Sequence, residues 1–375
     1  MKILDQGVVF DATAAAPTRR FCAFTDTTVL SDGRILVAFH SGSAKESPDE
    51  TVLMRVSPDG GCAWETVLDG LEPLSVDGAP GSWHHGRVTE LAPGHLLGAF
   101  WWLDRTGGRP MINPATTGTA PNRIFLMDSH DDGRTWTNRR AVDTSPFPSV
   151  ALMAAPLILS DGSVAVVSEA WKAYDDAGYG KHSAILTLSQ DGGYTFDPSI
   201  VVAHDPANRL LFWDQRPAVD RETGRLVAML WTHDREAGQD RNAHIAWSGP
   251  DGKSWSYPVD TGFAGQIPRP LILPGSRIFC AYIHRHHPPS LRGLLSPDFG
   301  RTWDLANEVV IYEHSPGRQA GMDVDRRGFT DYYADMGQWN FGHVEPGLLP
   351  DGTVFVSFYA GDSSSLSVRW ARIGL

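Results

Sequence analysis

Lysine, cysteine and long apolar runs are scarce in this chain of 375 residues, and each scarcity excludes a class of protein. With few lysines and a formal net charge of −12, the chain lacks the basic clusters that bind nucleic acid or anionic membranes. Cys22, Cys62 and Cys280 are odd in number and far apart, which excludes a disulfide framework and a zinc site. We therefore expect no metal and no cofactor.

Membrane and export signals are also missing from the sequence. No apolar run approaches the roughly eighteen residues of a membrane span, and the N-terminal segment lacks the apolar region of a signal peptide. The sequence therefore predicts a soluble protein. Its expected location is cytoplasmic by default, or secreted if a signal peptide has been removed.

A turn-forming pattern, Ser-x-Asp-x-Gly-x-Thr-aromatic, recurs along the chain. It occurs at residues 129–136, 189–196 and 296–303, with looser copies at 57–64 and 248–255. Successive copies start 72, 60, 59 and 48 residues apart, so one repeat is about 60 residues long and six repeats would fill the chain.

A second pattern recurs between these turns and predicts hairpins. β-rich apolar runs are interrupted by tight turns, most of them Asp-Gly or Pro-Gly, in which glycine supplies a positive φ. The six runs are residues 27–39, 88–100, 157–168, 218–230, 271–283 and 347–359. Each repeat is thus expected to contain four antiparallel strands, with the Ser-x-Asp turn before the last.

Six four-stranded antiparallel sheets can bury both faces by stacking around an axis. The sequence therefore predicts an all-β, six-bladed β-propeller formed by one domain over residues 1–375. The sixth repeat lacks a Ser-x-Asp turn. We expect residues 6–10 and 366–373 to share the last blade and to close the ring with strands from both termini.

The repeated Ser-x-Asp turns resemble the Asp-box, or BNR, repeats of the sialidase superfamily. Five copies between six hairpins span nearly the whole chain, which is specific for the fold and less specific for activity. The Asp side chains Asp59, Asp131, Asp191 and Asp298 are expected to cap backbone N–H groups of their turns rather than to catalyse.

The repeat also allows equivalent positions to be compared. About seven residues before each turn glycine, with one residue of slack, stand Asp26, Arg87, Ala155, Arg216, Arg269 and Glu345. Five of these six residues are charged. A charge in a buried central strand is costly unless it is paired or faces a ligand. The arrangement is expected either to plug the central tunnel with salt bridges or to bind an anionic sugar, and we favour the sugar site.

Strand alternation would place His85, Asp214 and His343 on the same side as the five charges. Arginine forks suit a carboxylate, and a pair of carboxyl groups suits glycosidic bond cleavage. We expect Asp26, Glu345 and His343 to be catalytic. The residues expected to bind substrate are His85, Arg87, Asp214, Arg216, Arg269 and Arg292.

Resemblance to sialidases implies an arginine triad, an aspartate acid/base and a tyrosine nucleophile assisted by glutamate. This chain has Phe24 and Thr25 where the family has an Arg-Ile-Pro motif. It has His343 near the place of the tyrosine, and Tyr332 and Tyr333 lie upstream in a long insert. Arg292 stands where a later triad arginine often occurs, and Asp26 fits the acid/base.

These departures favour a glycoside hydrolase for a different anionic sugar, such as a uronate, over one for sialic acid itself. Two alternatives stay open: a polysaccharide lyase in which His85 or His343 removes a proton from a uronate, and a non-catalytic carbohydrate-binding propeller. Residues 104–122 and 313–339 form long loops that are expected to wall the site. Trp101, Trp102, Trp171 and Trp339 are candidates for stacking on sugar rings, and Glu169 is a third candidate carboxylate.

Overall fold

The computed structural model describes residues 1–314 and 339–375 of the chain. These residues form twenty-seven β-strands and three short 3-10 helices: η1 (Pro17–Arg19), η2 (Thr106–Gly108) and η3 (Leu305–Asn307). The protein is therefore all-β, as the sequence predicts. Within the described ranges, no helix has the length and apolar character needed to span a membrane.

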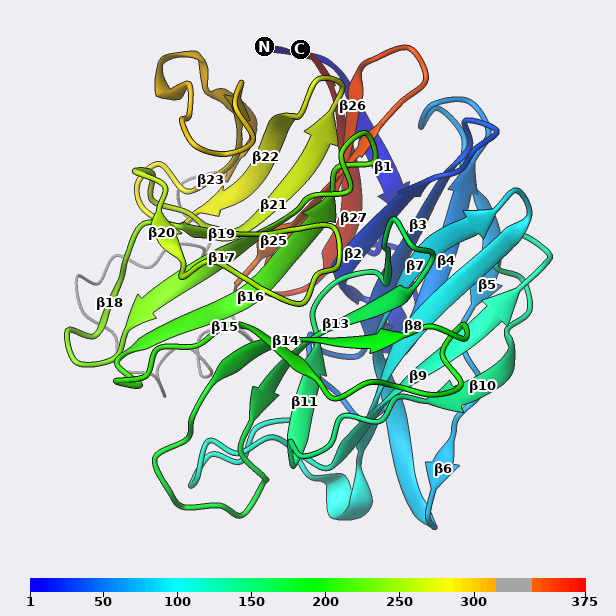
Figure 1. Cartoon of the computed structure of the whole chain (residues 1–375). Coiled ribbons are helices and arrows are strands. Elements are labelled where there is room, and N and C mark those ends of the chain that lie inside the picture. Colours follow the sequence, from blue (N-terminus) through cyan, green and yellow to red (C-terminus); the bar gives the residue numbers. More distant parts are fainter. Residues whose placement is uncertain (315–338) are drawn as a thin grey trace.

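The strands form five sheets (Figure 1). The largest contains β1 (Lys2–Phe10), β2 (Phe21–Val29), β3 (Ile35–Gly42), β4 (Thr51–Ser57), β5 (Glu65–Asp69), β25 (Phe341–Leu348), β26 (Val354–Gly361) and β27 (Leu366–Gly374). The second contains β6 (Ser75–Val76), β7 (Ala79–Ala92), β8 (His95–Asp104), β9 (Asn122–Ser129) and β10 (Thr137–Ala141).

The other three sheets follow in sequence order. The third contains β11 (Ser149–Leu152), β12 (Leu157–Ile158), β13 (Val164–Trp171), β14 (Ser183–Ser189) and β15 (Ile200–Ala203). The fourth contains β16 (Leu210–Val219), β17 (Leu226–Asp234), β18 (Gln239–Asp240), β19 (His244–Ser248) and β20 (Val259–Asp260). The fifth contains β21 (Gln266–Leu273), β22 (Arg277–His284), β23 (Ser290–Ser296) and β24 (Val309–Glu313).

The six predicted hairpins are all present as antiparallel strand pairs. They are β2–β3, β7–β8, β12–β13, β16–β17, β21–β22 and β25–β26. The turn glycines adopt the positive φ that the prediction requires, for example +88° at Gly33 and +86° at Gly162. These glycine turns therefore determine where the first strand of each hairpin reverses.

The three complete Ser-x-Asp turns, at residues 129–136, 189–196 and 296–303, share one set of hydrogen bonds from Thr to Asp and from Gly to Ser. In the copy at residues 129–136, the N–H and Oγ1 of Thr135 donate to Asp131, at 2.9 and 2.7 Å. Gly133 N donates to Ser129 Oγ at 2.9 Å, and Trp136 Nε1 donates to the Gly133 carbonyl at 3.0 Å. Asp131 therefore organises its turn, in agreement with the structural role predicted for this group of aspartates.

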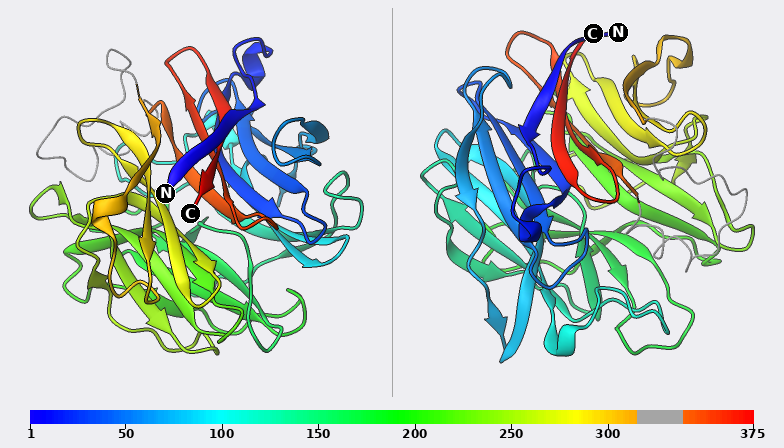
Figure 2. Two further views of the ribbon diagram at one scale, coloured as in Figure 1. Left: turned by 90° about the horizontal axis from the view of Figure 1, so that it is seen from above. Right: turned by 180° about the vertical axis from the view of Figure 1, so that it is seen from behind.

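The two ends of the chain lie side by side, as Figures 1 and 2 show. β1 pairs antiparallel with β27, which itself pairs with β26, so the predicted pairing of the terminal segments is present. A single parallel bridge, between Phe21 and Leu366, joins β27 to β2. Gly7 packs directly on Trp370, where an added Cβ would lie 2.7 Å from Nε1 of the indole.

Successive sheets pack on one another through their first strands. β7 contacts β2, β3 and β4; β11 contacts β8 and β9; β16 contacts β13 and β14; β21 contacts β16 and β17; and β25 contacts β21 and β22. Because β25 belongs to the largest sheet, this series of contacts leads from the largest sheet through the other four and back to it. In the described part of the chain, none of the five sheets closes on itself.

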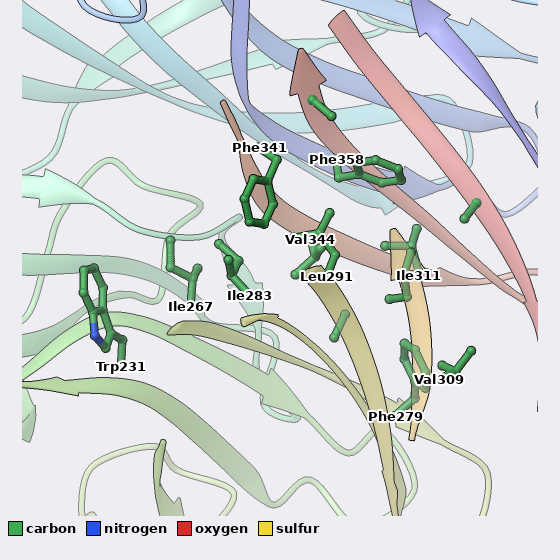
Figure 3. Packing of buried hydrophobic residues seen from close by; sticks show 14 of the residues in the cluster. Trp231, Ile267, Phe279, Ile283, Leu291, Val309, Ile311, Phe341, Val344 and Phe358 are labelled. Atoms are coloured by element: carbon green, nitrogen blue, oxygen red, sulfur yellow. The ribbon is translucent and has the colours of Figure 1, made fainter. Parts of the chain in front are cut away.

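The hydrophobic core lies between these packed sheets. Figure 3 shows the cluster between the fifth sheet and its neighbours, which includes Phe279, Leu291, Phe341, Val344 and Phe358. All five side chains are at most 3% exposed. Burial of such side chains contributes about 1.5–3 kcal/mol each, so the contacts between sheets help to stabilise the fold.

Candidate active site

Backbone irregularities in the first strands of the hairpins shape the site. Phe24, Asp214, Ile267 and His343 have positive φ values of 52°, 48°, 48° and 46°. Each stands at a register shift in β2, β16, β21 or β25, two residues before one of the charged positions found in the sequence. A left-handed conformation costs a non-glycine residue about 1–3 kcal/mol, and such bulges redirect side chains. Here they direct four side chains towards one cavity.

The cavity has a volume of about 500 Å³ and is lined by at least one residue from each of the six segments that begin the hairpins. These residues include Phe24, His85, Met153, Asp214, Ile267 and His343. Indole rings line much of the remaining wall, at Trp101, Trp171, Trp213, Trp231 and Trp339. A concave, largely aromatic site with a few polar groups is typical of a small-molecule or sugar pocket.

The five predicted charges meet in one buried cluster. Arg87 Nη1 lies 3.8 Å from Asp26 Oδ1 and 3.7 Å from Glu345 Oε1. Arg216 Nε lies 3.9 Å from Glu345 Oε1, and Arg269 Nε lies 2.8 Å from Glu345 Oε2. The sequence therefore located correctly a set of charges that comes from five separate repeats.

Only part of this cluster reaches the cavity surface. Arg87 and Arg216 line the cavity, whereas Asp26, Arg269 and Glu345 are not among its described lining residues. Asp26 and Glu345 are 2% and 3% exposed. Burial raises the pKa of Asp26 to about 6, although Arg87 acts to lower it. This placement favours the predicted alternative in which salt bridges fill the centre. In this structure, Asp26 and Glu345 are too deeply buried to contact a substrate in the cavity, as their predicted catalytic roles require.

Two other carboxylates do line the cavity. Asp214 Oδ1 accepts a hydrogen bond from Arg216 Nη2 at 3.2 Å, and the Asp214 side chain is 23% exposed. Burial raises the pKa of Asp214 to about 6, Arg216 acts to lower it, and the negative charge of Glu169 raises it further. Glu169 accepts from the backbone N–H of Gln215 at 3.1 Å and lies 3.1 Å from His182 Nε2. The pair combines a carboxyl group that can hold a proton near neutral pH with a second carboxylate that can stabilise positive charge.

The two predicted histidines, His85 and His343, also line the cavity. His85 Nε2 donates to the Leu152 carbonyl at 2.7 Å, so its Nδ1 atom is the free acceptor of the ring, although that atom is enclosed. Burial lowers the pKa of both histidines well below the usual value, with the nearby arginines acting in the same direction. Both rings are therefore neutral near neutral pH.

One predicted substrate-binding residue lies apart from the others. Arg292 Nη1 pairs with Glu308 Oε2 at 2.8 Å, its Nε donates to Ser290 Oγ at 2.8 Å, and it is not among the described lining residues. The expectation that Arg292 contacts substrate is not supported by this position. Arg292 thus has its two partners on β23 and beside β24, away from the described lining of the cavity.

Residues from both of the loops that were predicted to wall the site line the cavity. Met111, Asn113 and Thr117, from the loop over residues 104–122, line the cavity. In the second loop, Trp339 also lines it, while Tyr332 and Tyr333 lie outside the described residues. Trp102 belongs to the hydrophobic core instead, because its indole packs against the neighbouring sheet.

Sequence reasoning missed several cavity residues. Arg285 is 3% exposed in the cavity wall, where its guanidinium lies 4.3 Å from the Trp339 ring centroid. Lys45 and Tyr359 line the same cavity. Lys45 and Tyr359 stand near the ends of second strands rather than first strands, so comparison of first-strand positions could not find them.

His40, Glu50 and His84 form the one cluster of metal-binding residue types within the described ranges. Their bonding does not fit a cation. His40 Nδ1 donates to the His84 carbonyl at 2.8 Å, His84 Nδ1 lies 3.0 Å from Glu50 Oε2, and Arg105 pairs with the same carboxylate. Because both Nδ1 atoms carry protons and an arginine already balances the charge, the group is a hydrogen-bonded network.

The chain matches no protein-family model and no curated protein. Among solved structures, it is similar to a protein of unknown function from Dyadobacter fermentans, with 20% identity, a TM-score of 0.73, and coverage of 99% of this chain and 98% of that one.

Sialidases are also similar to the chain. A Hadza microbial sialidase has 14% identity and a TM-score of 0.65, with coverage of 99% of this chain and 68% of that one. The NanB sialidase of Streptococcus pneumoniae has 11% identity and a TM-score of 0.61, with coverage of 98% and 70%. At these identities the likeness concerns the fold alone, and the chain has a sialidase-like all-β fold.

Proposed function

We propose that this protein is a glycoside hydrolase and that Asp214 and Glu169 perform the cleavage in the aromatic cavity. The observation that carries this proposal is the presence of two carboxyl groups, from β16 and β13, in one cavity walled by indole rings. Glycosidases use a pair of carboxyl groups on either side of the scissile bond, and indole faces stack on sugar rings.

The environments of the two carboxyl groups suit different roles. Asp214, with its pKa raised to about 6, is the acid that protonates the leaving oxygen. Glu169 is held by the Gln215 N–H and by His182, and its charge stabilises the positive character that develops at the anomeric carbon. Such division of labour between neighbouring carboxyl groups follows from their surroundings.

In the proposed mode of binding, an anionic substituent of the sugar lies at Arg216. Arg216 lines the cavity and hydrogen-bonds Asp214. When Asp214 holds its proton, the guanidinium loses its nearest negative partner on the cavity side, and it attracts a carboxylate of the substrate instead. The acid-competent form of the site is thus also the form that favours an anionic sugar.

The proposal includes the predicted architecture. We propose that residues 1–375 form one domain in which the four-stranded units stack as six blades of a propeller. The succession of packing contacts between sheets, which returns to the largest sheet, supports this arrangement. The cavity would then lie at one mouth of the ring, where six first strands each contribute a side chain.

A screen of 4-methylumbelliferyl glycosides tests the proposed activity, because hydrolysis releases a fluorescent product from any accepted sugar. The panel includes an α-sialoside, a β-glucuronide and neutral hexosides. Turnover of at least one anionic glycoside is expected. Saturable binding of sugars by calorimetry, with no turnover of any glycoside, would instead identify a carbohydrate-binding protein and reject the proposal.

A second candidate function is β-elimination on a uronate. The observation in its favour is His343, a cavity residue that burial keeps neutral, as a base must be to take the proton next to a carboxylate. Elimination leaves an unsaturated sugar that absorbs in the ultraviolet, whereas hydrolysis does not. Absorbance on incubation with uronate polysaccharides therefore separates the two reactions.

A further inference from the structure

His84 lies on the cavity wall with one of its ring nitrogens tied back into the protein. Its imidazole is 2% exposed, and Nδ1 lies 3.0 Å from Glu50 Oε2. An ionised carboxylate can only accept, so Nδ1 carries a proton, and in the neutral ring Nε2 is then the acceptor. In the described part of the chain, Nε2 has no hydrogen-bond partner.

Glu50 is itself held in one orientation by buried groups. Its Oε1 accepts from Ser82 Oγ at 2.7 Å and pairs with Arg105, whose Nε also donates to Ser82 at 2.8 Å. The side chain is fully buried, yet His84, His40 and Arg105 hold its pKa well below the usual value. Glu50 is therefore ionised at any pH at which the protein works.

The neighbourhood separates His84 from the other histidines. The titratable groups that face it are Glu50, the His40 ring at 5.4 Å and the His85 ring at 5.3 Å, with Arg105 behind Glu50. His85 has no carboxylate partner among the described residues, and its free nitrogen is enclosed. Glu50 Oε2 lies 3.0 Å from His84 Nδ1 and 3.6 Å from His40 Nδ1, so the buried carboxylate would stabilise either imidazolium, as in the catalytic triads of hydrolases, but of these two rings His84 is the one among the described lining residues of the cavity.

We propose that His84 is the base of the hydrolysis, with Glu50 and Arg105 as its positioning residues. The inference rests on the proposed glycosidase function. His84 Nε2 takes a proton from water as the water oxygen bonds to the anomeric carbon. The bond from that carbon to the leaving oxygen breaks, and Asp214 gives its proton to this oxygen. The proton on His84 then leaves to solvent while Asp214 takes one up, which restores both groups.

The substitution His84→Asn tests this role with little change to the fold. The asparagine amide can still donate to Glu50, so it preserves the structural link and removes only the Nε2 acceptor. We expect kcat/KM, on the fluorogenic glycoside that the wild-type protein turns over best, to fall at least 100-fold, while the Tm stays close to that of the wild type. His244→Asn is the matched control, because His244 also donates through Nδ1, to the Asn242 carbonyl at 2.9 Å, and is outside the described cavity lining.

A spectroscopic measurement tests the positioning independently of activity. Long-range ¹H–¹⁵N NMR spectra, assigned by comparison with His84→Asn, should show neutral His84 as the Nδ1–H tautomer, and Glu50→Gln should produce a mixture of tautomers. An Nε2–H tautomer in the wild type overturns the proposal even if the variants fold poorly. Wild-type-like kinetics of His84→Asn, together with loss of activity in Asp214→Asn, overturn the role of His84 and leave the proposed function intact. If no glycoside is turned over, both fail.

Discussion

The guanidinium of Arg269 and the carboxylate of Glu345 join two sheets through a buried ion pair, with Nε of Arg269 2.8 Å from Oε2 of Glu345. Glu345 also lies within 4 Å of Arg87 and Arg216, which pair in addition with Asp26 and Asp214. Loss of its charge would leave Arg269 without a carboxylate partner among the described residues and would leave excess positive charge in a buried region. Such a change is costly in any protein.

We therefore predict that Glu345→Gln lowers the free energy of unfolding by about 3–5 kcal/mol. Urea denaturation measures this loss. Glu308→Gln is the control, because it breaks the partly exposed pair with Arg292 and should cost about 1 kcal/mol or less. A Glu345→Gln protein of wild-type stability that has lost catalysis would return Glu345 to the catalytic role that the sequence predicts.

Asp26 should make stability depend on pH in an unusual direction. Its pKa is about 6 in the folded protein and near 3.8 when unfolded, so between these values the folded state binds more protons. The stability that this difference confers is complete below about pH 4 and is lost as the pH rises through about 6. Asp214 acts in the same direction.

The substitution Asp26→Asn should flatten this dependence. Between about pH 4 and pH 7, the free energy of unfolding should change by about 1–3 kcal/mol less in the variant than in the wild type. Urea denaturation at several pH values provides the comparison with the wild type. An unchanged slope in the variant would contradict the raised pKa of Asp26.

The activity itself should fall on the alkaline side as Asp214 loses its proton. Because the acid must be protonated, kcat/KM should decline as the pH rises through about 6. The pH profile on a fluorogenic glycoside measures this decline. A glycoside with a very acidic leaving group needs little protonation, so its profile should lack the alkaline limb. An alkaline limb of equal depth with both substrates would assign the limb to another group.

The Ser-x-Asp turns should matter for stability and not for catalysis. Asp131→Ala removes the acceptor of the two bonds from Thr135 on the outer part of its sheet. We predict a loss of about 1 kcal/mol in unfolding free energy with kcat unchanged. A fall in kcat at unchanged stability would show that this turn acts on the cavity.

Sequence reasoning found the repeats because turns need particular residues. The tight turns require a positive φ at glycine, and this requirement identified all six hairpins, with Gly33 and Gly162 as examples. The same counting located Arg87 and Glu345, whose side chains lie 3.7 Å apart in the structure. The positions of the turns thus predicted that residues far apart in the sequence lie close together, because every repeat places equivalent positions at the same depth.

The sequence could not show which of the predicted residues line the cavity and which belong to the buried cluster of charges. Simple strand alternation places Phe24 on the same side as Asp26, but at the left-handed bulge at Phe24 its ring lines the cavity while Asp26 stays among the buried charges. No glycine marks the bulge, so the pattern gives no sign of it. Glu50 and His84 are likewise brought together by packing between β7 and the loop before β4.

The most direct test of the account compares turnover by the Asp214→Asn and Asp26→Asn proteins on the same glycoside, with both proteins confirmed as folded. We predict that kcat falls about 100- to 10,000-fold in Asp214→Asn and less than about tenfold in Asp26→Asn, because Asp214 faces the cavity and Asp26 does not. The reverse order, with Asp26→Asn inactive and Asp214→Asn near normal, would contradict the claim that cleavage occurs at Asp214 on the cavity wall.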